Sequence, residues 1–400
     1  MTIVDADRVT ELARQVVAEH DPTQVPVTEF LGACYDAGLS WVHFPEGLGG
    51  LGASRGLQAV ADRLLQGAGG PVPLGLNPMG YGMAAPTIRE HARSDDLKRF
   101  FLRPLATTED IWCQLFSEPG AGSDLAGLAT SATPDGAEWI VNGQKVWTSL
   151  AHKARWGLLL ARTDPDAPKH RGLTYFVLDM HDPGVECRPL RQMTGQAEFN
   201  EVYITDARIP DTHRLGAVGD GWRVAMTTLM NERSALGGSA NRRGSGTIGE
   251  AVALWASRPD LHTPVLRDRL TQLWLRSEAQ RLTSERSRAA AMTGAAAGGP
   301  GPEASIGKLV GAELNQAIYQ FCMDLLGPEG ILYHSYAMHG ADESQDWRGP
   351  LQQRYLRSRA NTIEGGTSEV MRNILGERVL GLPGDLRADA GMPWKEVPRG

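Results

Sequence analysis

The chain has 400 residues, of which 42% are hydrophobic and 22% charged, and a formal net charge of −7 at pH 7. This composition argues against a disordered chain and predicts one large core or two to three packed domains. The modest charge and the lack of a long basic run argue against an extended nucleic-acid surface.

The four cysteines are scattered along the chain without Cys-x-x-Cys spacing. This argues against a zinc site or a disulfide framework and is typical of a reducing cytosol. No run reaches the roughly 18 apolar residues of a membrane span, and the N-terminus is acidic and amphipathic. We therefore expect a cytoplasmic protein without a metal site or a membrane span.

The first two segments of the chain differ in pattern. Residues 1–110 carry apolar residues at helical spacing between Gly/Pro-rich connections, which predicts an N-terminal helical domain. Residues 111–216 hold short runs rich in Trp, Ile, Val, Tyr and Phe. The pairs Asp135-Gly136 and Asn142-Gly143 lie between such runs as hairpin signals, so this segment predicts a middle antiparallel β domain.

Helical spacing returns over residues 217–400, where long amphipathic segments predict a C-terminal helical bundle. Residues 293–305 are too rich in Gly and Pro for a helix, and we expect a loop between two bundle helices there. The expected fold class is therefore α+β and mostly helical.

Two stretches of the middle segment favour a planar heteroaromatic cofactor. Residues 114–127, QLFSEPGAGSDLAG, predict a shaped loop that exposes backbone N–H groups and hydroxyls. About twenty residues later, Trp147 stands beside Thr148 and Ser149 and offers a flat face next to two hydroxyl donors. Each stretch alone is also compatible with an ordinary turn or with a tryptophan in a β core.

A dinucleotide site of the Rossmann type is a formal alternative, because residues 47–52, GLGGLG, satisfy G-x-G-x-x-G. Pro45 interrupts the junction that would lead into that loop, and no βαβ series follows it. Neither G-x-S-x-G nor H-E-x-x-H occurs, so serine hydrolases and zinc proteases are weaker alternatives still.

Taken together, the motifs resemble those of the acyl-CoA dehydrogenase family over nearly the whole chain, in the family's order and spacing. They are FPEGLGGLG (44–52), LFSEPGAGSD (115–124), NGQKVWTS (142–149), NEVYITDARIP followed by GDGWRVAMTTLMNER (200–233), and GGTSEVMRN (365–373). The resemblance implies a C-terminal four-helix bundle, with FAD at its junction with the β domain. It also implies oxidation of an acyl-CoA to trans-2-enoyl-CoA, with electrons passed to an electron-transfer flavoprotein.

The resemblance also assigns binding roles, residue by residue. Gln114, Phe116 and Ser117 match positions that line the flavin, and Trp147, Thr148 and Ser149 match the stretch that covers its face. Ser123 matches a contact to the CoA pantetheine, and Thr367 and Glu369 match residues near the FAD ribose and diphosphate. The start of a helix at Thr367 agrees with this, because helix N-termini favour phosphate.

The catalytic base has two candidates. Many members of the family carry a Glu directly before Gly-Thr, but Gly365 occupies that position here and Glu364 falls one residue earlier. Other members carry the Glu on a bundle helix before an Arg, as Glu232 and Arg233 do here, and we expect Arg233 at the substrate. We favour Glu232 over Glu364; a structural ion pair of Glu232, with no base in the chain, is the third interpretation. The Gly365 N–H is expected to donate to the thioester carbonyl.

The chain departs from the family where a neighbouring subunit usually completes the FAD site. Asp324 stands where Gln is usual, and the usual Arg-x-x-Phe segment has no counterpart around residues 242–251. An acid beside a diphosphate is unfavourable unless a cation lies between them. We expect a homodimer or homotetramer, with a hetero-oligomer as the alternative. A non-catalytic partner subunit and a flavin monooxygenase of the same fold are the alternative functions.

Overall fold

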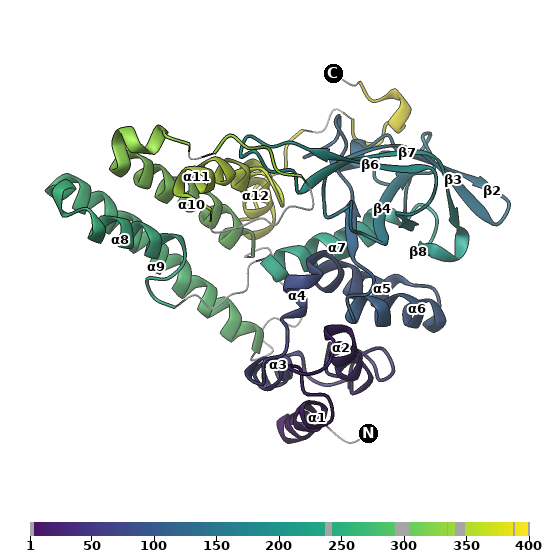
Figure 1. The fold of residues 1–400 in the computed structure, drawn as a ribbon. Helices are drawn as coiled ribbons and strands as arrows, with labels where there is room; N and C mark the ends of the chain where they lie inside the picture. Colours follow the sequence, from purple (N-terminus) through teal and green to yellow (C-terminus); the bar gives the residue numbers. More distant parts are fainter. Residues whose placement is uncertain are drawn as a thin grey trace. The chain divides into compact units, whose positions relative to one another are not determined.

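The computed structural model describes residues 4–236, 242–292, 304–333, 335–340, 349–386 and 389–398, without the side chains of 232–236, 288, 290–292 and 304. The chain forms two compact units. The first comprises Met1–Leu190, Phe199–Asn231 and Asp389–Gly400, and the second comprises Arg191–Glu198 and Glu232–Ala388. Figure 1 shows the helices and strands of both units. Each unit has a buried core of its own.

Helices occupy the N-terminal part of the first unit, as the sequence predicts. They are α1 (Ala6–Glu19), α2 (Val27–Asp36), α3 (Gln58–Gly67), α4 (Pro73–Leu76), α5 (Ala85–His91) and α6 (Asp95–Ala106). The N-cap of α6 illustrates why they start where they do. The Ser94 side chain accepts from Leu97 N, and Asp95 and Asp96 place negative charge in the first turn. Helix α7 (Gly221–Leu236) begins in this unit and buries Val224, Ala225 and Thr228.

The middle of the chain forms one eight-stranded sheet, which confirms the predicted β segment (Figure 1). Its order is β6-β7-β3-β2-β4-β5-β8, and β1 pairs with β4. The pairings are antiparallel except those of β4 with β1 and β2. The strands are β1 (Trp112–Leu115), β2 (Ser131–Asp135), β3 (Glu138–Ser149), β4 (Trp156–Arg162), β5 (Leu173–Asp179), β6 (Val185–Leu190), β7 (Phe199–Pro210) and β8 (Arg214–Leu215).

One of the two hairpin signals is confirmed and the other is wrong. Asp135 pairs with Glu138 across a tight turn, in which Gly136 has a φ of +64°. Asn142-Gly143 lies instead inside β3, where the pairing with β7 shifts register. A Cβ on Gly143 would lie 2.3 Å from Thr130 Oγ1, so this glycine permits a close approach between chain segments rather than a turn.

The second unit is helical and packs around α10, in agreement with the predicted bundle. Its helices are α8 (Thr247–Ser257), α9 (Pro264–Met292), α10 (Ala304–Leu326), α11 (Leu351–Ser358) and α12 (Ser368–Ile374). Ile318, Phe321 and Cys322 of α10 form a buried core with Ile248 of α8 and Leu273 of α9. The expected loop at 293–305 falls mostly outside the described residues.

Within the described parts of both units, no helix is long and apolar enough to cross a membrane. The same residues contain no group of three or more His, Cys, Asp or Glu side chains that could hold a metal ion. The cysteines are free thiols, and burial raises the pKa of Cys34 and of Cys322 to about 12, so these two are not reactive thiolates.

Candidate active site

Trp147 lies at an irregularity of β3. The register of β3 against β7 shifts between Lys145 and Thr148, and Trp147 has a φ of +62°, a left-handed conformation that a bulky residue rarely adopts. Its side chain is 58% exposed and meets the Phe199 ring edge-on, with the ring centroids 5.9 Å apart. Strained backbone that presents an aromatic face to the outside marks a site where a planar ligand can stack.

Thr148, the next residue, is fully buried, and its Oγ1 has no hydrogen-bond partner within the described residues. Its backbone carbonyl accepts from Asn200 Nδ2 at 3.1 Å, which fixes the strand at this point. A buried hydroxyl left unsatisfied costs about 1–3 kcal/mol, so the arrangement suits a ligand with ring nitrogen or oxygen acceptors. Together with Trp147 and the half-buried Ser149, it fits a flavin ring.

The loop after β1 is tied to the same point of β3. Val146 N donates to Ser117 O at 2.9 Å, which brings Ser117 beside Trp147. Gln114 lies on β1 and is half-buried. The Phe116 ring is buried and packs edge-on against Tyr175 at 5.8 Å, so this residue faces the core. The loop backbone at Ser117 therefore lies next to Trp147, whereas the Phe116 side chain packs into the core rather than at the predicted flavin face.

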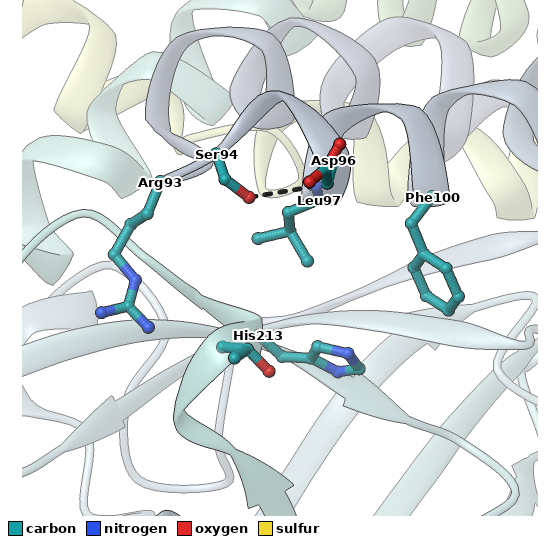
Figure 2. Close-up of a pocket in the computed structure, with 7 residues that line it drawn as sticks. Arg93, Ser94, Asp96, Leu97, Phe100 and His213 are labelled. Atoms are coloured by element: carbon teal, nitrogen blue, oxygen red, sulfur yellow. Dashed lines mark hydrogen bonds between the residues drawn. The ribbon is translucent and has the colours of Figure 1, made fainter.

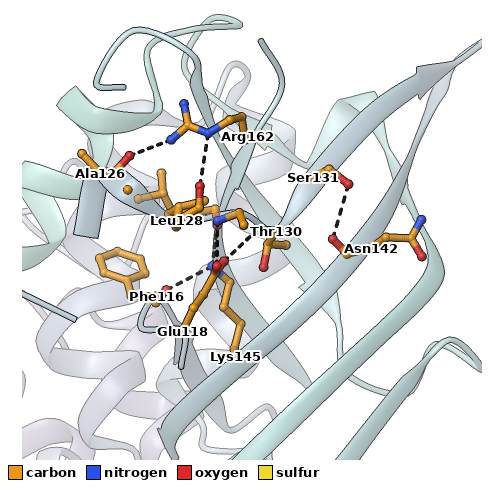
Figure 3. Close-up of polar contacts among 12 residues, drawn as sticks. Phe116, Glu118, Ala126, Leu128, Thr130, Ser131, Asn142, Lys145 and Arg162 are labelled. Atoms are coloured by element: carbon orange, nitrogen blue, oxygen red, sulfur yellow. Dashed lines mark hydrogen bonds and ion pairs between the residues drawn. The ribbon is translucent and has the colours of Figure 1, made fainter. Parts of the chain in front are cut away.

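A buried ion pair that sequence reasoning missed holds this loop against β3 (Figure 3). Lys145 Nζ, fully buried, donates to Glu118 Oε1 at 2.9 Å and to the carbonyls of Phe116 and Leu160 at 3.0 and 2.9 Å. The Glu118 carboxylate also accepts from Ala129 N and Thr130 N. The sequence signal for this ion pair was a lysine at an inward-facing position of a strand, together with a glutamate in the Gly/Ser/Pro-rich loop.

The ionisation of this pair follows from its surroundings. Burial acts to raise the pKa of Glu118, but the Lys145 charge and the hydrogen bonds from Thr130 and Ala129 outweigh it, so the pKa lies below its ordinary value. Burial lowers the pKa of Lys145, opposed by the Glu118 charge. The carboxylate is therefore held ionised, and it organises the loop rather than accepting a proton from a ligand.

Ser123, the predicted pantetheine contact, is exposed in the same loop. Next to it, both carboxylate oxygens of Asp124 accept from Lys169 Nζ, at 3.0 and 2.9 Å. A Cβ added at Gly120 or Gly122 would meet no described atom within 4 Å, so the centre of the loop faces open space. The hydroxyl of Ser123 is thus accessible to a ligand that lies along this face.

In the second unit, Thr367 caps α12 by accepting from Val370 N at 3.2 Å. Ser368 is buried, and its Oγ has no hydrogen-bond partner within the described residues. Gly365 and Gly366 precede them with φ of +61° and +94°, values that glycine adopts without strain. Glu369 is exposed and lies 3.8 Å from Arg372. The unsatisfied Ser368 hydroxyl is compatible with the predicted phosphate contact.

Of the two candidate bases, Glu364 has a described side chain and Glu232 does not. The Glu364 carboxylate accepts from Arg357 Nη1 and Nη2 at 3.2 and 2.8 Å and from Asn361 Nδ2 at 2.8 Å. Glu232 and Arg233 belong to α7, and their side chains lie outside the described residues. Glu364 is thus engaged in a structural ion pair, whereas the role of Glu232 stays a prediction.

Asp324, which stands where the family usually has Gln, pairs with an arginine of the same unit. Arg269 Nη2 of α9 donates to Asp324 Oδ2 at 2.7 Å, and Gln320 Nε2 donates to Oδ1 at 2.9 Å. Burial acts to raise the pKa of Asp324, but these two hydrogen bonds keep it below its ordinary value. The acid is therefore ionised and paired within its own unit.

A pocket of about 500 Å³ lies elsewhere in the first unit (Figure 2). Leu97 and Phe100 of α6 point toward His213, and none of the sequence-predicted site residues lines it. Its charged groups are paired inside the protein: Arg93 with Asp211 at 2.9 Å and Asp96 with Arg99 at 3.0 Å. The charged side chains that line the pocket are therefore paired, and Leu97 and Phe100 give it apolar walls.

Comparison with known sequences gives the class of protein. The profile described as "Acyl-CoA dehydrogenase, middle domain" matches residues 113–207, and "Acyl-CoA dehydrogenase, C-terminal domain" matches residues 219–380. Acyl-CoA dehydrogenase IpdE1 of Mycobacterium tuberculosis is 40% identical over 350 residues, which are 87% of this chain and 86% of that protein. The chain belongs to the acyl-CoA dehydrogenase family of FAD-dependent oxidoreductases.

A second relative differs in length. Acyl-CoA dehydrogenase FadE34 of Mycobacterium tuberculosis is 41% identical over 353 residues, 88% of this chain but 46% of FadE34. The chain therefore spans about half the length of that relative.

Solved structures show the same fold. The structure described as "Tcur3481-Tcur3483 steroid ACAD" has a TM-score of 0.70 and 25% identity, covering 96% of this chain and 100% of that one. The ChsE4-ChsE5 complex from Mycobacterium tuberculosis has a TM-score of 0.68 and 27% identity, with the same coverage. A glutaryl-CoA dehydrogenase from Mycobacterium smegmatis, solved in complex with FADH2, shares the fold at 20% identity, with a TM-score of 0.65, over 96% of this chain and 97% of that one.

Proposed function

We propose that this chain catalyses the α,β-dehydrogenation of an acyl-CoA thioester to trans-2-enoyl-CoA and passes the electrons to an electron-transfer flavoprotein. The observation that carries the proposal is the exposed Trp147 indole at the β3 bulge, beside the unsatisfied Thr148 hydroxyl. FAD, when bound, would supply the acceptor for the hydride that leaves the β-carbon. Trp147 would cover the ring face, and Thr148 and Ser149 would donate to its polar edge.

We propose Glu232 as the base that removes the α-proton. A base for this step must be free to approach the thioester and must have a pKa raised toward neutrality by a dry site. Glu364 is instead held by Arg357 and Asn361. The Gly365 N–H would donate to the thioester carbonyl and stabilise the enolate that develops when the proton leaves. Arg233 and Ser123 would contact the substrate, and Thr367 and Glu369 would lie near the FAD ribose and diphosphate.

For the substrate we propose a bulky, branched or steroid-derived acyl-CoA. The solved structure with 25% identity and full coverage of its own chain is described as a steroid enzyme, which supports this class. The Glu-Arg pair at 232–233 agrees, because some family members that act on branched, long or steroid-derived acyl groups share that arrangement. Short straight-chain acyl-CoAs should then be poorer substrates.

The test starts with the purified chain, its flavin spectrum and a panel of acyl-CoAs added anaerobically. The proposal expects bound flavin to bleach with steroid-derived or branched acyl-CoAs. Glu232→Gln should keep the flavin and slow bleaching by about 100-fold or more, the usual size of a lost general base. A flavin-loaded wild-type protein that no acyl-CoA bleaches would contradict the proposed activity.

A second candidate function is that of a partner subunit in a mixed oligomer. Asp324 and the missing Arg-x-x-Phe segment favour it, because the half of the FAD site that reaches a neighbouring subunit departs from the family pattern. The similar solved structures described as two-component complexes agree with it. Flavin binding and flavin reduction together decide between these functions. A chain that binds flavin and is reduced by acyl-CoA without another protein is an enzyme in its own right.

A further inference from the structure

The C-terminal segment Asp389–Pro398 is docked on the first unit, next to the loop between β4 and β5. Pro393 forms an isolated β-bridge with Pro168. Trp394 N donates to Ala167 O at 2.9 Å, and Lys395 N donates to Pro165 O at 3.1 Å. These backbone contacts fix the position of the Trp394 side chain.

Trp394 and Arg162 together engage three successive carbonyls of the loop that leads into β2. Trp394 Nε1 donates to Gly127 O at 3.0 Å. Arg162 donates through Nη2 to Ala126 O at 2.6 Å and through Nε to Leu128 O at 3.1 Å, contacts that are visible in Figure 3. The Arg162 guanidinium lies 4.2 Å from the Trp394 ring, so the indole covers one face of it.

Lys169 makes a second connection between the C-terminal segment and this loop. Its Nζ lies 2.9 Å from Asp124 Oδ2 and 2.6 Å from Asp389 Oδ2. Burial acts to lower the pKa of Lys169, but the hydrogen bonds to Asp389 and Asp124 outweigh it and raise the pKa, so the lysine is protonated. One cation therefore joins the residue that follows Ser123 to the start of the docked segment.

The loop 117–128 is thus held at both ends. Lys145 and Glu118 fix its beginning against β3, while Arg162, Trp394 and Lys169 fix its end. Gly120 and Gly122 lie between these anchors in open surroundings. Without fixed ends, a loop so rich in glycine would lose much conformational entropy on binding a ligand.

We propose that the segment 389–398 is a latch that positions the loop 117–128 for the acyl-CoA, with Trp394, Arg162 and Lys169 as positioning residues. The inference rests on the proposed function for the role of Ser123 as a CoA contact. The latch orders the loop before the thioester binds, which improves substrate binding rather than proton removal. Loss of the latch should therefore raise KM and leave kcat nearly unchanged.

The first experiment measures the latch without any substrate. Hydrogen exchange of peptides that cover residues 120–128 is followed by mass spectrometry in the wild type, Trp394→Ala and Lys169→Met. We expect exchange about 10-fold faster in both variants, because these amides lose protection by local opening. Peptides of β4 and β5 should be unchanged. Arg188→Ala is the control, since the exposed Arg188–Glu186 ion pair of β6 lies outside both the segment 389–398 and the loop 117–128.

The second experiment measures steady-state turnover of the same proteins with acyl-CoA as substrate and ferrocenium as the electron acceptor that reoxidises the flavin. KM for the best acyl-CoA should rise about 10-fold in Trp394→Ala and Lys169→Met, with kcat within about twofold of the wild type. Trp394→Phe, which keeps a ring on Arg162 but loses the N–H donor, should lie between the wild type and Trp394→Ala. Equal exchange in the variants and the wild type would overturn the latch, and faster exchange with an unchanged KM would overturn its role in substrate binding. A wild type that no acyl-CoA reduces would contradict the proposed function instead, while the exchange experiment would still decide on the latch.

Discussion

Arg357 and Glu364 form a two-point ion pair, in which Nη1 and Nη2 of the guanidinium lie 3.2 and 2.8 Å from the two carboxylate oxygens. Asn361 Nδ2 donates to the same carboxylate at 2.8 Å. The Glu364 side chain is 40% exposed, so water reaches the carboxylate and it is not in the dry site that removal of the α-proton requires. A carboxylate with fixed partners on both oxygens serves to shape the turn before α12.

Glu364→Gln should therefore leave flavin reduction by acyl-CoA within about threefold of the wild-type rate, since a group outside the reaction contributes little to its barrier. Arg357→Met is the matched control, because it removes the other half of the pair and should behave in the same way. Stopped-flow absorbance of the flavin measures both variants. A loss near 100-fold in Glu364→Gln alone would assign the base to Glu364 rather than to Glu232.

Trp147→Ala should lower the flavin content of the purified protein, because the exposed indole supplies the stacking face at the β3 bulge. An aromatic contact of this kind is worth about 0.5–1.5 kcal/mol beyond its buried area, which corresponds to weakening of roughly 2- to 13-fold. Trp147→Phe should retain most of the flavin. The ratio of flavin to protein absorbance measures the content, and a wild-type ratio in Trp147→Ala would remove this residue from the flavin site.

Glu118→Gln should destabilise the protein in a pH-dependent way. Removing one partner of a buried ion pair costs about 3–5 kcal/mol. The folded-state pKa of Glu118 lies below its ordinary value of 4.5, so its stabilising contribution is fully present above that pH and is lost as the pH falls through the folded-state pKa. The difference in unfolding free energy between wild type and variant should be large at pH 7 and shrink as the pH falls below 4.5. Urea denaturation followed by circular dichroism measures it.

The double variant Glu118→Gln/Lys145→Met tests how much of the lost stability comes from leaving the Lys145 charge without its partner. Lys145 is fully buried, and without Glu118 its charge is uncompensated. Replacing it by an apolar side chain of similar length should restore part of the lost stability. If the double variant is less stable than Glu118→Gln, the carbonyl contacts of Lys145, rather than its ion pair, dominate at this position.

The sequence was sufficient for the helical and β segments, because these depend on local pattern, whereas the residues assigned to the flavin stay a prediction. Helical spacing predicted the helical character of α1 to α6, and β-branched and aromatic runs predicted β3, β4, β5 and β7. Asn142-Gly143 was misleading: the same dipeptide that makes a tight turn is also used where Thr130 approaches β3 too closely for a side chain. That approach involves a contact between distant segments, which no local pattern contains.

The contacts that hold the site could not be predicted for the same reason. Glu118 and Lys145 are 27 residues apart, and Trp394 meets Gly127 across 267 residues. In the sequence, Glu118 looks like an ordinary acidic residue of a loop, Lys145 like a strand lysine, and Trp394 like a tryptophan near the C-terminus. Their partnership follows from long-range packing: β1 pairs with β4 in the same sheet as β3, and the segment that carries Trp394 forms a bridge to the loop between β4 and β5.

The last prediction concerns assembly. The segment after α10 exposes several large apolar side chains: Ile331 is 82% exposed, Leu332 66% and Met338 67%. Ile331 and Leu332 are consecutive, and adjacent exposed apolar side chains favour burial against another chain. The proposed function implies an oligomer of acyl-CoA dehydrogenase chains. Ile331→Glu with Leu332→Glu should therefore raise the dissociation constant of the oligomer by about 10-fold or more, since a buried charge without a partner is costly.

Analytical ultracentrifugation at micromolar concentration measures this effect, and circular dichroism verifies that the variant is folded. Val27→Glu is the matched control, because Val27 is an exposed apolar residue of the first unit, 44% accessible, on α2. It should leave the mass unchanged. A wild-type protein that sediments as a monomer while bleaching with acyl-CoA at full rate would show that the exposed side chains have another role, since the proposed oligomer would then be unnecessary for the reaction.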